Sequence, residues 1–246
     1  MTRAAITVCV ICLAVLFGCS GSGKMSQKVQ KQASAPGCTS LDKTEKAELI
    51  FSIKLNNEIY RQSDWGEPPQ IAIWLESPDG SVIRTVFVTY RAGFGHWVDK
   101  VECPVALPYW ISRWNRETKT TGAPSFNTHV PDAVTGATPK LEFTASTRVK
   151  PGSDWLYFIE VNVSGDFNKY FPSMRKNGEP DPQGNGQPSI VYKGQINAAN
   201  SDVSTPQIIG RTEQWQPVDY LIADMNGITT AKALLSEIRI SCRVLQ

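Results

Sequence analysis

Side chains in much of this sequence alternate between apolar and polar with a period of two, which is the pattern of a half-buried β-strand. The alternation is clear in ELIFSIKL (48–55), where Leu49, Phe51, Ile53 and Leu55 share one face. Further runs are rich in β-branched and aromatic residues and are bounded by Gly, Pro, Asn or Asp. These runs are IAIWLES (71–77), SVIRTVFVTY (81–90), KLEFTASTRVK (140–150), WLYFIEVNVS (155–164), PSIVYKGQIN (188–197) and ALLSEIRISCRVL (233–245).

The connections between these runs indicate antiparallel sheets. Ser77-Pro78-Asp79-Gly80 is a turn sequence and predicts a hairpin between the second and third strands. Residues 140–150 and 155–164 form another pair, separated by Pro151-Gly152-Ser153-Asp154. The chain is therefore predicted to be all-β, an antiparallel β-sandwich with a β-rich barrel as the alternative. One short helix is expected in ALPYWISRWNRE (106–117), and Trp74 and Trp155 are expected in the core.

The N-terminus, MTRAAITVCVICLAVLFGCSGSGK, predicts export. Arg3 gives a short basic region, and the apolar run from Ala4 to Phe17 is too short to span a bilayer but fits a secretory signal. We therefore expect residues 1–18 to be a signal peptide. Residues 19–45 contain almost no large apolar side chain and are expected to be a flexible tether before a domain at 46–246.

The end of the signal, Leu16-Phe17-Gly18-Cys19, resembles the lipobox of bacterial lipoproteins. The resemblance implies cleavage before Cys19 and its modification with diacylglycerol and an N-acyl chain such as palmitate, which together anchor a protein stably. The alternative is an ordinary signal peptide with an incidental cysteine. Residue 20 is Ser rather than Asp, which resembles the sorting pattern of outer-membrane lipoproteins facing the periplasm.

Charge and cysteine content restrict the possible partners and covalent bonds. The formal net charge is +2 and no basic stripe is present, so no nucleic-acid partner is expected. After processing, the chain keeps three cysteines in addition to Cys19, namely Cys38, Cys103 and Cys242. They allow one disulfide in an oxidising compartment. The spacing does not determine which pair would form.

Several segments resemble the predicted periplasmic proteins grouped as domain of unknown function 2271. These segments are IAIWLESPDGSVIRTVFV, PDAVTGATPK, YFIEVNVSGDFNKYFP and GNGQPSIVYKGQI, which occur in the family's order between about Ile71 and Ile196. The resemblance implies an exported, immunoglobulin-like β-sandwich, similar to the immunoglobulin-like domain of flagellar hook-capping proteins. It implies no catalytic residue.

The segment DAVTGATPK (132–140) has two interpretations. It resembles the motif of exported flavin carriers, in which the final Thr is esterified with FMN; Thr138 would be the attachment site and Asp132 would help recognition. Alternatively, it is a polar turn in which Asp132 and Thr135 bond to local backbone and Gly136 supplies a permissive φ. Pro139 and Lys140 depart from the flavin motif.

No other motif indicates catalysis or metal binding. His96 and His129 are the only histidines, and neither a Gly-x-Ser-x-Gly nor a His-Glu-x-x-His motif occurs. The Gly- and Pro-rich loop at 176–189 is a candidate binding edge. We therefore expect a non-catalytic lipoprotein of the cell envelope, anchored to the membrane, whose sandwich binds an unidentified periplasmic partner such as a protein. The alternative is a periplasmic electron-transfer protein carrying FMN.

The flavin interpretation predicts a change in mass. Co-expressed with a flavin transferase, the exported protein should gain one FMN less water and become yellow, because the Thr138 hydroxyl would form a phosphodiester. Intact-mass spectrometry of Thr138→Ala should show loss of this increment, whereas Thr135→Ala, the matched control, should retain it. A mass difference between wild type and Thr138→Ala equal to the Thr-to-Ala change alone would exclude flavin at Thr138.

Overall fold

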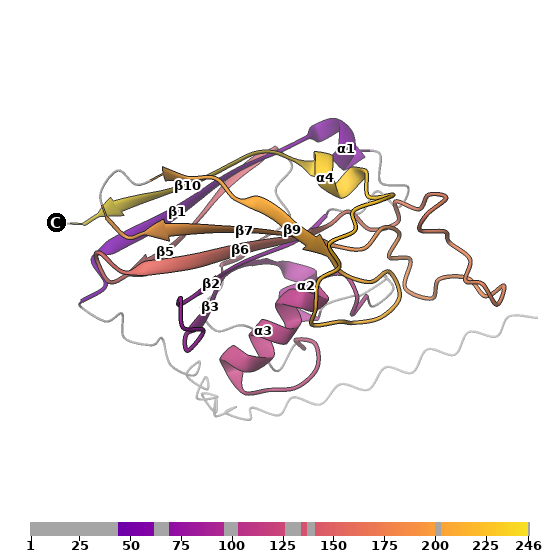
Figure 1. The fold of residues 1–246 in the computed structure, drawn as a ribbon, viewed down its shortest axis with the longest axis horizontal. Coiled ribbons are helices and arrows are strands. Elements are labelled where there is room, and N and C mark those ends of the chain that lie inside the picture. Colours follow the sequence, from indigo (N-terminus) through magenta and orange to yellow (C-terminus); the bar gives the residue numbers. More distant parts are fainter. Residues whose placement is uncertain are drawn as a thin grey trace, which may run out of the picture. The chain divides into compact units, whose positions relative to one another are not determined.

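Two β-sheets form the computed structural model of this protein, which describes residues 44–61, 69–95, 103–125, 134–136, 141–199 and 203–245. The first sheet has four antiparallel strands in the order β5-β1-β10-β8. Its strands are β1 (Ala47–Leu55), β5 (Glu142–Val149), β8 (Val203–Ser204) and β10 (Leu235–Val244). Figure 1 shows β10 and β1 of this sheet at the top of the view and β2 and β3 of the second sheet below them.

The second sheet has six strands in the order β4-β3-β2-β6-β7-β9. They are β2 (Gln70–Glu76), β3 (Ile83–Thr89), β4 (Val134–Gly136), β6 (Asp154–Asn162), β7 (Ile190–Asn197) and β9 (Gln207–Arg211). All neighbours are antiparallel except β4, which runs parallel to β3. The all-β sandwich is thus confirmed, and because the described strands form two separate sheets, the barrel alternative is wrong.

The strand connections agree with the sequence in one case and differ in another. β2 and β3 form the predicted hairpin, closed by the Ser77 N–H donating to Val82 O at 2.9 Å. In contrast, β5 and β6 do not pair with each other: β5 pairs with β1 and β6 with β2. The turn at 150–153 therefore carries the chain from one sheet to the other, so the predicted pairing of these two runs is wrong.

The core between the sheets follows from the alternation in β1. Leu49, Phe51 and Ile53 are at most 1% exposed and face the second sheet, where Ile73 and Ile159 are fully buried. Trp74 and Trp155 are buried, as expected, but Trp74 lies on the opposite face of its sheet from this core. The central strands β2 and β6 of the second sheet are therefore buried on both faces.

Helix α3 (Pro108–Thr118) covers the outer face of the six-stranded sheet, as Figure 1 shows. This is the helix predicted from the sequence, whereas α1 (Asn57–Arg61), α2 (Tyr90–Phe94) and α4 (Thr230–Leu234) are single turns too short to show a helical period. Trp110 and Trp114 of α3 are at most 1% exposed and pack with Trp74 and Phe158 of the sheet. The Trp74 and Phe158 rings stack with centroids 5.1 Å apart.

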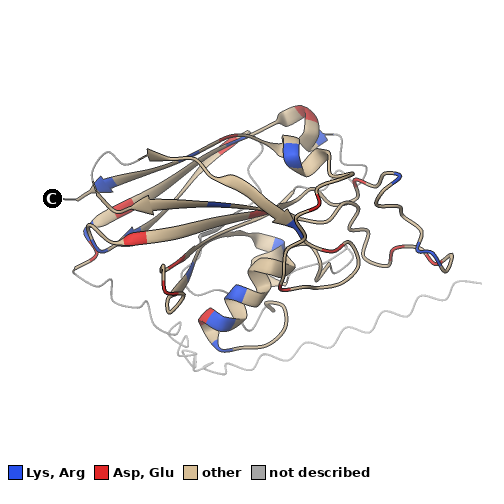
Figure 2. Cartoon of the chain, in the orientation of Figure 1, with Lys and Arg blue, Asp and Glu red and all other residues tan. Residues whose placement is uncertain are grey.

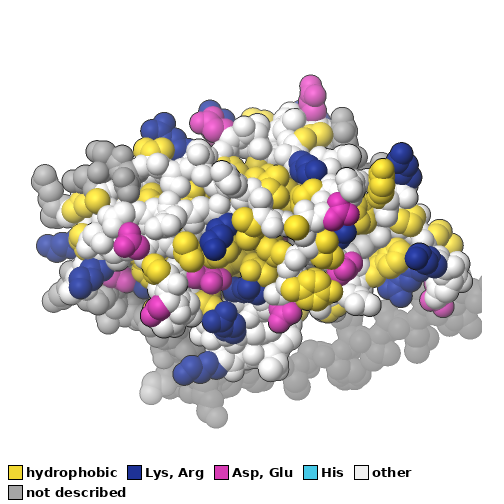
Figure 3. Space-filling view, in the orientation of Figure 1, with side chains coloured by type: hydrophobic (Ala, Val, Ile, Leu, Met, Phe, Trp, Pro, Cys, Tyr) yellow, Lys and Arg dark blue, Asp and Glu magenta, His cyan; other side chains and the backbone are white. Residues whose placement is uncertain are grey.

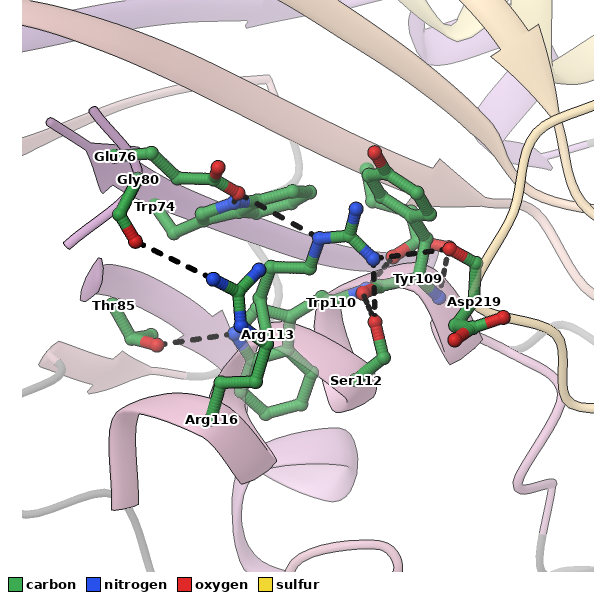
Figure 4. Close-up of polar contacts among 11 residues, drawn as sticks. Trp74, Glu76, Gly80, Thr85, Tyr109, Trp110, Ser112, Arg113, Arg116 and Asp219 are labelled. Carbon is green, nitrogen blue, oxygen red and sulfur yellow. Dashed lines mark hydrogen bonds and ion pairs between the residues drawn. The ribbon is translucent and has the colours of Figure 1, made fainter. Parts of the chain in front are cut away.

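Polar contacts fix the orientation of α3 on the sheet (Figure 4). The Arg113 guanidinium lies 3.6 Å from the ring centre of Tyr109 and 3.6 Å from the Glu76 carboxylate. The Trp110 indole N–H donates to Thr85 Oγ1 at 3.2 Å. Glu117 accepts the Thr85 backbone N–H at 3.0 Å, beside the register shift between β2 and β3. The backbone N–H of Thr85, next to this bulge, therefore has a hydrogen-bond acceptor on the helix.

Glu160 of β6 holds the first turn of α3 from within the protein. Its fully buried carboxylate accepts the backbone N–H groups of Trp110 at 2.6 Å and Tyr109 at 3.3 Å, and the Ser189 hydroxyl at 2.6 Å. Helix N-termini favour a negative charge and leave N–H groups without intrahelical partners. Burial outweighs these hydrogen bonds and raises the pKa of Glu160 to about 7.

This raised pKa predicts how stability depends on pH. Between the ordinary Glu pKa of 4.5 and about 7, the folded protein holds a proton on Glu160 that the unfolded chain has lost, so this group destabilises the fold as pH rises. Relative to Glu160→Gln, wild type should lose on the order of 3 kcal/mol of unfolding free energy over this range. Urea unfolding at several pH values measures it.

The exposed Glu58, changed to Gln, is the matched control and should follow wild type at every pH. Parallel curves for wild type and Glu160→Gln would show that Glu160 has no raised pKa.

Candidate functional site

The residues singled out as sites from the sequence lie outside the described residues. These are Cys19, Asp132 and Thr138, together with Cys38, His96 and His129. Between Asp132 and Thr138, the described residues Val134–Gly136 form β4, which pairs with Phe87, Val88 and Thr89 of β3. The middle of this segment is therefore a paired strand rather than the proposed polar turn, and flavin attachment at Thr138 stays a prediction.

The part of the chain that the structure describes contains neither a metal-binding cluster nor a membrane-spanning helix. No group of three or more His, Cys, Asp or Glu side chains there is arranged to hold a metal ion. None of the described helices is both long and apolar enough to cross a bilayer. The two described cysteines, Cys103 and Cys242, are buried and form no disulfide with each other, and burial raises the pKa of the Cys103 thiol to about 12.

A candidate site among the described residues is a groove of about 560 Å³ between two loops. One wall comes from residues 169–176 of the loop between β6 and β7, and the other from residues 211–216 at and after the end of β9. We call this the loop groove. Figure 3 shows hydrophobic and cationic side chains next to each other over these loops, at the right of the view.

Aromatic rings covered by cations characterise the loop groove. The Arg175 guanidinium carbon lies 5.7 Å from the ring centre of Trp215, and the Lys169 Nζ lies 5.2 Å from that of Tyr170. Tyr170 is 57% exposed, and Trp215 is half-buried. Such stacking is favourable and keeps a cation oriented beside an apolar surface.

The charge of the loop groove is predominantly positive. Lys169, Lys176 and Arg211 line it, Arg175 lies over Trp215, and Glu213 is the acidic residue of the lining. None of the ion pairs found among the described residues involves these four cations. Elsewhere, charges of both signs are interspersed over the strands (Figure 2). The groove can therefore attract an anion.

Hydrogen bonds join the two walls of the groove. The buried Gln214 donates its amide to Pro172 O at 2.9 Å, which links one loop to the other. Asn168 accepts the backbone N–H groups of Tyr170 and Phe171 at 2.9 and 3.0 Å and donates to Gly227 O at 2.8 Å. Gly227 has a φ of 80°, and a Cβ there would lie 2.4 Å from the Tyr170 Cβ. These contacts fix the position of the Tyr170 ring.

A buried polar network supports the loops from below. The Gln187 backbone N–H donates to Asp166 Oδ1 at 2.8 Å, and its side-chain oxygen accepts the Thr229 N–H at 2.7 Å. Asn185 donates to Gln214 O at 2.9 Å and accepts the Asn162 amide at 2.9 Å. Because the polar atoms of these buried side chains have protein partners, the loops are held in a defined conformation.

The loop at 176–189, predicted as a binding edge, thus has two different parts. Residues 176–180 are exposed, and a bridge between Met174 and Pro180 closes them into a turn beside the groove. Residues 185–189 are buried and belong to the supporting network. The groove residues Tyr170, Trp215 and Arg211 were not predicted, because their only sequence signal is aromatic and basic residues near one another in loops.

The chain matches no protein-family profile, and comparisons with curated proteins and with solved structures find no significantly similar protein. The resemblance to domain of unknown function 2271 therefore stays a prediction from the sequence.

Proposed function

We propose that this protein is an exported lipoprotein of the cell envelope whose β-sandwich is a non-catalytic binding module. Two independent features support the proposal. The lipobox-like sequence ending at Cys19 supports the anchor, and the loop groove supports binding. The tether at 19–45 would let the module reach its ligand in the periplasm while the lipid stays in the outer membrane.

The single observation that carries the binding function is the oriented set of cations on aromatic rings in and beside the loop groove. Arg211 shows how these cations are held: its Nε donates to Asp224 O at 2.7 Å and its Nη1 to Thr212 O at 3.0 Å, while its guanidinium lies over Phe171. A ligand would meet side chains already in place, which lowers the entropic cost of binding.

The arrangement performs recognition by simple physical means. Aromatic faces contact apolar surface of a ligand, and the cations contact its negative groups at short range. The groove volume of about 560 Å³ lies within the usual range for small-molecule sites. No bond needs to be made or broken for this function.

The anchor predicts a specific effect of Cys19→Ser. Expressed in a Gram-negative host with an alkyne-labelled fatty acid, wild type should be labelled and recovered with membranes, because Cys19 carries the acyl chains. Cys19→Ser should lose both properties. Cys12→Ser, which changes a cysteine inside the signal, is the matched control and should behave as wild type. Labelled, membrane-bound Cys19→Ser protein would contradict the anchor.

A further inference from the structure

We infer that the loop groove binds a short anionic oligosaccharide whose negative groups are sugar carboxylates. This inference rests on the proposed binding function and specifies its ligand class. It is drawn from three properties of the groove: flat apolar faces, cations placed at intervals between them, and walls whose backbone is already hydrogen-bonded.

The first property is stacking surface. Tyr170 is 57% exposed and Trp215 is half-buried on the opposite wall, so each presents part of its ring to the groove. Met174, at 50% exposure, and Pro172 extend the apolar surface between them. Sugar rings have flat apolar C–H faces that pack against aromatic side chains, and their hydroxyl edges remain in water. A half-exposed groove suits such a ligand better than it suits a wholly apolar one.

The second property is the placement of charge. Arg175 and Lys169 lie over the two rings, and Lys176 is exposed at the same wall. Arg175 is half-buried, and its guanidinium lies over Trp215 beside the residues that line the groove. A planar guanidinium bonds a carboxylate through two parallel N–H groups. A carboxylate on a sugar that stacks beside Trp215 would therefore lie next to Arg175.

The third property argues against an acidic peptide. Extended peptides are usually recognised through main-chain hydrogen bonds to a strand or loop. The backbone N–H groups of Tyr170 and Phe171 already donate to Asn168, and that of Arg175 donates to Glu179 O at 2.7 Å. This wall therefore offers a ligand side chains rather than those main-chain donors.

Isothermal titration calorimetry with full-length lipidated protein in detergent tests the inference. The probe is trigalacturonate, the uncharged comparison is maltotriose, and the charged peptide comparison is tetraglutamate. Trigalacturonate should bind, and its affinity should fall as salt is raised because the contacts include exposed charges. Maltotriose and tetraglutamate should bind at least about tenfold more weakly.

Variants locate the binding to the groove. Tyr170→Ala and Arg175→Gln should each weaken trigalacturonate binding by about tenfold, and Lys176→Gln by about threefold. Lys150→Gln, which removes an exposed lysine outside the groove, should leave the affinity unchanged. Circular dichroism of each variant should match wild type, because these side chains lie at the surface or rim rather than in the core.

Two results would overturn the inference. One is the absence of trigalacturonate binding, or binding that Tyr170→Ala and Arg175→Gln do not change. The other is tetraglutamate binding as tightly as trigalacturonate; the groove would then still bind a ligand, so the proposed function would stand while the saccharide assignment would fall. The lipid anchor is tested separately by Cys19→Ser.

Discussion

The two sheets and α3 form three layers. Their arrangement depends on burial of the Glu160 carboxylate against the first turn of α3. The six-stranded sheet has apolar side chains on both faces, including Trp74 and Phe158 on the side away from the other sheet. Without α3 this outer face would be exposed to water, which is unfavourable in proportion to its apolar area. Trp110 supplies the apolar contact, and Glu160 fixes the helix end by accepting its backbone N–H groups. By covering the apolar outer face of the six-stranded sheet, α3 stabilises the two-sheet sandwich.

The strands of this fold were largely predictable, because burial of one or both faces leaves a clear pattern in the sequence. Each of the seven predicted runs forms a strand, and the helical period of residues 106–117 identifies α3. β8 has two residues and β4 three, so neither is long enough to show alternation. The role of Glu160 was not predictable. In a strand with alternating side chains, a glutamate indicates an exposed position. Glu160 is buried because α3, which lies elsewhere in the sequence, packs against this face of the sheet.

The loop groove could not be predicted for a related reason. Its walls are separated by more than thirty residues in sequence, and the contact between Gln214 and Pro172 that joins them has no local signature. The Gly- and Pro-rich composition predicts a loop at 176–189, but composition does not distinguish its exposed turn from the buried Asn185 and Gln187 that support the site. Each part of the fold has a separate role. The sandwich provides a rigid base, and the buried amides fix the loops. The exposed aromatic and basic side chains remain available for a ligand.

Amide hydrogen exchange at the start of α3 tests the central claim most directly. The first N–H groups of a helix have no intrahelical partner and normally exchange quickly. In this protein the amides of Tyr109 and Trp110 donate to a buried carboxylate. They should therefore exchange much more slowly than amides without an acceptor, since they become accessible only when α3 leaves the sheet. Exchange of the Trp110 amide as fast as that of the exposed loop residue Asn177 would contradict the account.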